Sequence, residues 1–171
     1  MVSNIDMNSV KTKKLQLEQL IPIWKERLKA GQSVRFSPKG ISMLPLLRQG
    51  RDSVLLSFPP EKLKKHDIVL YQRENGMYVL HRIIEVQEDG RVYTCIGDNQ
   101  FVKEPGLCRE QMIAVVTAFT RGKREHSVKE PVYRMYCSLW HGSRPLRYFV
   151  FRVVRKLRTI ARRWKIRGDV N

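Results

Sequence analysis

Six short runs rich in β-branched and aromatic residues, each bounded by turn residues, narrow the folds open to this 171-residue chain. They cover residues 33–40, 52–58, 67–72, 77–86, 91–97 and 112–119. Runs of this length and composition are typical of β-strands. Asn75-Gly76 and Asp89-Gly90 predict hairpins between neighbouring runs, because glycine adopts the positive φ that tight turns require. We therefore expect a mainly β, antiparallel domain.

Apolar residues at helical spacing predict a helix on each side of the β domain. In residues 13–30 these are Leu17, Leu20, Ile21, Trp24 and Leu28, with Pro22 inside the pattern. In residues 144–167 they are Leu146, Phe149, Val150, Val153, Leu157, Ile160, Ala161 and Trp164, interleaved with ten Lys or Arg. We divide the chain into an N-terminal helical segment (1–33), a β domain (34–122) and a basic extension with an amphipathic helix (123–171).

The charge is strongly unbalanced, with 33 Lys and Arg against 16 Asp and Glu and a formal net charge of +17. Such a surface attracts phosphate, either of nucleic acid or of anionic lipid headgroups. The sequence contains neither a secretory signal pattern nor 18 consecutive apolar residues. We expect a protein of the cytoplasm or of the cytoplasmic membrane face, without a transmembrane helix. The three cysteines include no CxxC pair, and we expect no disulfide framework, metal or cofactor.

Three polar positions stand out within the β region. Ser42 lies in a loop between small and apolar neighbours, His81 interrupts an apolar strand, and Asp98 lies in a polar turn after another strand. A serine hydroxyl needs a base within hydrogen-bond reach to act as a nucleophile, and the base needs an orienting partner. Taken singly, each residue is also explained as a turn serine, a packed histidine and a turn aspartate.

The surrounding segments resemble the motifs of the signal peptidase I and LexA-type clan of serine peptidases. Ser42-Met43-Leu44-Pro45 is similar to the nucleophile box, and the likeness extends over about residues 34–118. Val79-Leu80-His81-Arg82-Ile83 resembles the endoplasmic-reticulum and archaeal branch, which has a histidine base in place of lysine. Gly97-Asp98-Asn99-Gln100 is similar to the third box, and Glu104 stands where that branch has a further aspartate.

The resemblance implies a serine endopeptidase that cleaves a peptide or protein precursor, with Ser42 as nucleophile and His81 as general base. Asp98 and Glu104 both remain candidates for the acid that orients His81. Gly40 departs from the family, which often has a hydroxyl there for the oxyanion hole.

The extension leaves three alternatives. Its helix contacts an anionic membrane, packs on the β domain, or binds nucleic acid; the lack of a recognisable reading module disfavours nucleic acid. A catalytically inactive domain of the same fold, binding peptides or an anionic surface, is the alternative to an enzyme.

Overall fold

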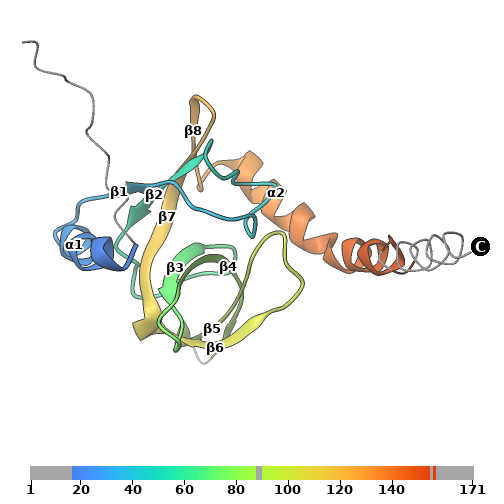
Figure 1. Cartoon of the computed structure of the whole chain (residues 1–171), viewed down its shortest axis with the longest axis horizontal. Coiled ribbons are helices and arrows are strands. Elements are labelled where there is room, and N and C mark those ends of the chain that lie inside the picture. Colours follow the sequence, from blue (N-terminus) through green and yellow to red (C-terminus); the bar gives the residue numbers. More distant parts are fainter. Residues whose placement is uncertain (1–16, 88–89, 155, 157–171) are drawn as a thin grey trace, which may run out of the picture.

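The computed structural model describes residues 17–87, 90–154 and 156, and these form a mainly antiparallel β structure with helices on both sides, as the sequence predicts (Figure 1). The strands are β1 (Val34–Phe36), β2 (Ser53–Ser57), β3 (Ile68–Gln72), β4 (Tyr78–Gln87), β5 (Val92–Ile96), β6 (Glu104–Cys108), β7 (Met112–Arg121) and β8 (Arg124–Ser127). The helices are α1 (Leu17–Lys29), the 3₁₀ turn η2 (Arg109–Gln111) and α2 (Pro131–Gly142).

The eight strands form one sheet in the order β1-β2-β7-β3-β4-β5-β6, and β8 pairs with β7. Figure 1 shows β7 running between the β1–β2 pair and the curved part formed by β3 to β6. The strand contributes to two hydrophobic cores, because successive side chains point to opposite faces of a strand. Val116 joins the core beneath α1 and α2, whereas Val115 joins the core enclosed by β3 to β6.

Both predicted hairpins are present. β3 and β4 pair from Ile68↔Arg82 to Gln72↔Tyr78, with Gly76 at φ 82° in the connecting turn. β4 and β5 pair up to Gln87↔Val92.

Two strands were not predicted. The Pro105-Gly106 pair that indicates a turn lies inside β6, which among the described strands pairs with β5 alone. An edge strand accommodates proline because the missing N–H costs no ladder hydrogen bond on its free side. The polar segment of β8 pairs with β7 across Gly122 and carries the sheet as far as Ser127.

The C-terminal helix begins earlier than its predicted start at 144. Pro131 opens α2, as suits a first-turn proline, and residues 144–154 are again helical after a single turn residue, Ser143. Backbone hydrogen bonds from Ser143 to Leu139 and from Arg147 to Ser143 keep the helical register across this point. Residue 155 and residues 157–167 of the predicted helix lie outside the described residues.

The two halves of this helix differ in packing. Tyr133 and Cys137 of α2 are buried in the core beneath it, whereas residues 144–154 extend away from the sheet (Figure 1). Among the described residues, no helix is long and apolar enough to cross a bilayer.

Candidate active site

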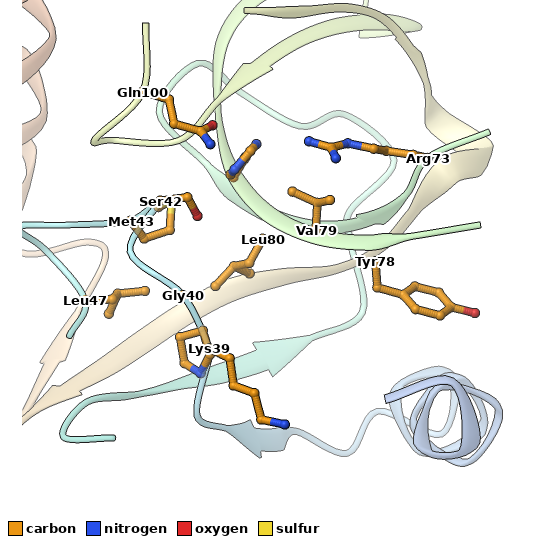
Figure 2. A pocket seen from close by; sticks show the side chains of 12 residues that line it. Lys39, Gly40, Ser42, Met43, Leu47, Arg73, Tyr78, Val79, Leu80 and Gln100 are labelled. Carbon is orange, nitrogen blue, oxygen red and sulfur yellow. The ribbon is translucent and has the colours of Figure 1, made fainter. Parts of the chain in front are cut away.

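A cavity of about 240 Å³ lies between the loop after β1, the β3–β4 hairpin and the turn after β5. Ser42 and His81 both line it, together with Arg73, Leu80 and Gln100. Figure 2 shows Ser42, Arg73 and Gln100 around the same opening. In the described part of the chain no direct hydrogen bond links Ser42 to His81, a looser arrangement that is common in enzymes without substrate. The fold thus brings the predicted nucleophile and base, 39 positions apart, to one cavity.

Ser42 is held in a tight loop by its neighbours. Met43 and Leu47 are buried in the core on either side of a turn closed by the hydrogen bond from the Leu47 N–H to the Met43 carbonyl, at 3.0 Å. Gly40 enters the loop at φ 92°, a conformation that glycine adopts without strain, and its N–H donates to Oε1 of Gln49 at 2.7 Å. The apolar residues of the motif therefore anchor the loop and leave the serine half-exposed at the cavity.

The turn after β5 supports this loop from behind. The Asn99 N–H donates to the Ser42 carbonyl at 2.8 Å, and the Asn99 side-chain amide donates to the Ile41 carbonyl at 3.3 Å. A Cβ on Gly97 would lie only 2.7 Å from the Ser42 carbonyl oxygen, so this position has room for glycine alone. The Gly-Asp-Asn turn thus sets the backbone position of Ser42.

His81 is 2% exposed, and its Nδ1 atom contacts two partners. Nδ1 lies 3.1 Å from Oε1 of Glu104 and 3.2 Å from the Tyr71 hydroxyl, which itself donates to Oε2 of Glu104 at 2.7 Å. Glu104 only accepts, and the Tyr71 hydrogen is already used. Nδ1 must therefore carry the hydrogen, which leaves Nε2 as the unprotonated nitrogen of the neutral ring.

Glu104 is the first residue of β6 and lies opposite Cys95 of β5. Burial favours its protonated form, but hydrogen bonds from Arg73, at 2.5 and 2.8 Å, and from Tyr71 hold its pKa below the usual range. The carboxylate is therefore ionised at neutral pH and faces the imidazole.

Burial also lowers the pKa of His81, and the nearby Glu104 charge offsets only part of this effect. A buried imidazole loses hydration most when it is charged, so the neutral form is favoured. His81 is thus unprotonated near pH 7 and able to accept a proton.

Asp98 does not contact His81 through any hydrogen bond in the described residues. It accepts two hydrogen bonds from the fully buried Arg82, at 2.8 and 2.7 Å. Burial would raise the pKa of Asp98, but the hydrogen bonds and charge of Arg82 lower it to about 2. His81 and Arg82 are successive residues of β4 and point to opposite faces of the sheet. Asp98 pairs with Arg82 on the face away from His81, so Glu104, and not Asp98, contacts the imidazole.

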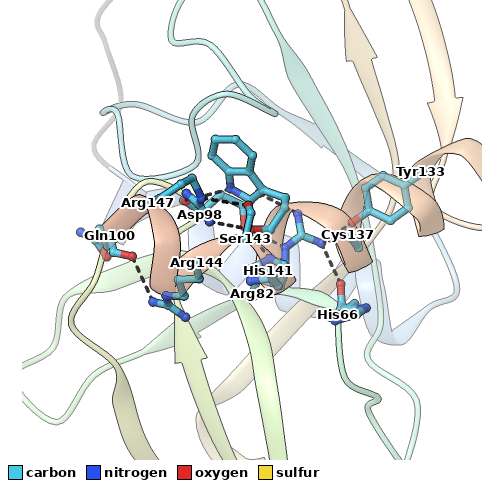
Figure 3. A network of polar contacts seen from close by, with 11 residues as sticks. His66, Arg82, Asp98, Gln100, Tyr133, Cys137, His141, Ser143, Arg144 and Arg147 are labelled. Atoms are coloured by element: carbon cyan, nitrogen blue, oxygen red, sulfur yellow. Dashed lines mark hydrogen bonds and ion pairs between the residues drawn. The ribbon is translucent and has the colours of Figure 1, made fainter. Parts of the chain in front are cut away.

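The inner face of the C-terminal helix holds the Asp98–Gln100 turn in place (Figure 3). The Trp140 Nε1–H donates to the Asp98 carbonyl at 3.0 Å, and Arg144 donates to the Gln100 carbonyl at 3.0 Å. The Arg147 guanidinium lies 3.7 Å from the centre of the Trp140 ring and donates to the Asp98 carbonyl at 3.4 Å. Helix, turn and serine loop therefore form one chain of contacts.

Arg82 is the second link between the helix and the sheet. Besides Asp98, it donates to the Tyr133 hydroxyl at 2.6 Å, to Sγ of Cys137 at 3.2 Å and to the His66 carbonyl at 3.0 Å. These contacts satisfy a guanidinium that is fully removed from solvent. The buried Arg82–Asp98 pair thus joins β4, the β5 turn and α2.

The sequence-based interpretation missed several residues of the site. Tyr71 lies near the end of β3 and Arg73 directly after the strand, a spacing of two that places side chains on one face of an extended chain. That spacing was the available signal for Tyr71 and Arg73. The sequence gives no comparable signal for Trp140 and Arg147, because their contacts with the turn depend on how α2 packs.

No three His, Cys, Asp or Glu side chains gather into a group that could hold a metal ion within residues 17–87, 90–154 and 156. No protein-family model and no curated protein matches the chain. Its function is therefore inferred from the residues and the geometry of the cavity.

Proposed function

We propose that the chain is a serine endopeptidase resembling signal peptidase, with Ser42 as nucleophile, His81 as general base and Glu104 as the acid that orients the base. One observation carries the proposal. A buried, neutral histidine, with Nδ1 held by a carboxylate, lies on the wall of a cavity that also exposes a loop serine. A serine, a base and an orienting acid are what acyl transfer requires.

In the proposed reaction, Nε2 of His81 accepts the Ser42 proton while Oγ attacks the peptide carbonyl and forms a tetrahedral oxyanion. The imidazolium next gives this proton to the leaving amine as the C–N bond breaks, and an acyl-enzyme remains. Water, deprotonated by His81, then hydrolyses the ester and regenerates the Ser42 hydroxyl. The ionised Glu104 stabilises the imidazolium in both steps.

The oxyanion requires hydrogen-bond donors near Ser42. Among the described residues, nothing accepts a hydrogen bond from the Ser42 N–H, so this group is available as a donor. Gly40 offers no hydroxyl, and its N–H is engaged by Gln49. Gln100 lines the same cavity, and we assign its side-chain amide as the second donor.

The substrate in this proposal is a peptide or protein precursor. Met43, Leu47 and Leu80 form an apolar wall of the cavity beside Ser42. An aliphatic side chain next to the scissile bond would contact this wall, whereas a charged one would lose hydration there. The cavity therefore fits a small apolar residue.

Labelling with a fluorophosphonate tests the proposal directly, because only an activated serine reacts with it. We expect one adduct, located by mass spectrometry on Ser42. Ser42→Ala should abolish labelling and His81→Ala should slow it by ~100-fold or more. Ser138→Ala is the matched control, since Ser138 is an exposed serine far from the cavity in sequence. A folded wild-type protein that stays unlabelled would contradict the proposal and favour the catalytically inactive alternative.

A further inference from the structure

A line of exposed apolar side chains follows the C-terminal helix and its continuation. We call it the outer stripe: Val132, Met135, Leu139, Leu146, Val150 and Val153. Their exposed fractions lie between 40% for Val153 and 70% for Val132. Most monomeric proteins scatter such residues singly, so a continuous stripe indicates a binding surface.

The outer stripe occupies a single side of the helix. Its members recur at spacings of three, four and seven, which stack on one face. The opposite face holds Tyr133, Cys137 and Trp140, all directed at the sheet and the Asp98 turn. The stripe therefore faces away from the domain, on the helix that leaves the body of the protein in Figure 1.

Basic side chains flank the stripe. Within the described residues the exposed ones are Arg134, Arg152 and Lys156, whereas Arg144 and Arg147 contact the Asp98–Gln100 turn on the inner face. The sequence has no Asp or Glu between Pro131 and Gly168, although both are present elsewhere in the chain. Charge of one sign thus borders an apolar face.

These two features together identify the partner. Nucleic acid would neutralise the arginines but leave the stripe in water, and a protein groove would cover the stripe without needing so much positive charge. The interface of an anionic bilayer takes up both, with apolar side chains among the acyl chains and basic groups at the phosphates. We propose that the outer stripe docks on an anionic phospholipid membrane, with the helix lying in the interfacial plane. The docking does not depend on the peptidase proposal.

Co-sedimentation of the full chain with vesicles tests the docking. The probes are vesicles of phosphatidylcholine alone and of phosphatidylcholine mixed with phosphatidylglycerol. We expect binding to the mixed vesicles that weakens with salt. Leu139→Glu with Leu146→Glu should lower the partition coefficient by on the order of 100-fold, because each leucine contributes about tenfold through apolar burial.

The matched control is Ile23→Glu with Phe58→Glu, two exposed apolar residues away from the helix. Both double variants lower the net charge by two, from +17 to +15, so a loss confined to the stripe variant isolates the apolar contact. The control should bind like the wild type. Ser42→Ala should also bind normally, which separates this test from that of the peptidase.

Three results would overturn the docking. The intact protein could ignore mixed vesicles at low salt. The stripe variant could bind as well as the wild type, which would show that charge alone attracts the protein to the vesicles. Sedimentation velocity could instead show a dimer that the stripe variant dissociates, in which case a second copy covers the stripe.

Discussion

His81 and Arg82 are adjacent residues whose buried side chains make different contacts on opposite faces of β4. On one face, His81 joins Tyr71 and Glu104 beside the cavity. On the other, Arg82 and Asp98 form a fully buried ion pair beneath α2. A substitution at either position should therefore affect a different property, catalysis on one face and stability on the other.

Substitutions of Glu104 and Asp98 should therefore have different effects. Glu104→Gln places an amide nitrogen within reach of Nδ1 and favours the opposite tautomer, in which Nε2 carries the hydrogen and cannot accept a proton. We expect turnover to fall by ~100-fold or more with little change in melting temperature. Peptide cleavage assays and thermal melts of the same preparations measure both effects.

Asp98→Asn should instead destabilise the fold by about 3–5 kcal/mol, because Arg82 then keeps a buried charge without its partner. Thermal or urea unfolding measures this loss. Arg82→Met combined with Asp98→Leu should recover part of the stability, since both charges are then removed. Full stability in Asp98→Asn would contradict the structural role, and full activity in Glu104→Gln would leave His81 without an orienting acid.

The pH dependence of cleavage should report the environment of His81. Burial lowers its pKa from 6.5, and the base is active only above that pKa. The acidic limb of kcat/KM should thus lie below pH 6.5, with activity lost as the pH falls through it. Arg73→Gln removes a positive charge that also lowers this pKa, so its limb should move to higher pH. A limb that does not move would argue against His81 as the titrating base.

At the scale of elements, α2 and its continuation have one face in contact with the domain and one exposed face. The inner face contacts the Asp98–Gln100 turn, which in turn holds the Ser42 carbonyl. The outer face carries the exposed stripe. One helix therefore connects an exposed apolar surface to the loop that carries Ser42.

Trp140→Phe tests the inner face as a positioning element. It removes the hydrogen bond to the Asp98 carbonyl but keeps an aromatic ring beneath Arg147. We expect Ser42 labelling to slow by ~3–10-fold and stability to fall by ~1 kcal/mol. The pH profile should stay unchanged because His81 is untouched. Leu139→Ala, at the exposed neighbouring position, is the control. Unchanged labelling in Trp140→Phe would show that Trp140 does not position Ser42.

At the scale of the whole molecule, the two proposals predict that catalysis and membrane binding depend on different parts of the protein. The stripe variant Leu139→Glu with Leu146→Glu keeps every residue of the cavity, so it should cleave a short soluble peptide at the wild-type rate. A precursor peptide carrying a lipid anchor on anionic vesicles should be cleaved ~10-fold or more slowly, because enzyme and substrate no longer share a surface. Equal slowing of both substrates would show that the stripe acts on the active site itself.

The strand runs, the hairpins and the helix before the sheet could be predicted from sequence because their signals are local. Alternation along a strand, a glycine in a turn and apolar residues three or four apart all lie within a few positions of one another. β6 and β8 could not be predicted, since Pro105-Gly106 and a polar segment become strands only through pairing with β5 and β7.

The motifs of the sequence by themselves named Ser42 and His81 and limited the acid to Asp98 or Glu104. Which of those acids contacts His81 was decided only by the tertiary structure. Because successive side chains of a strand point to opposite faces, Arg82 and its partner Asp98 lie on the face away from the cavity. The pairing of β6 with β5 brings Glu104 to His81. The same holds for the two faces of the C-terminal helix, because packing against distant residues decides which side chains meet and which stay exposed.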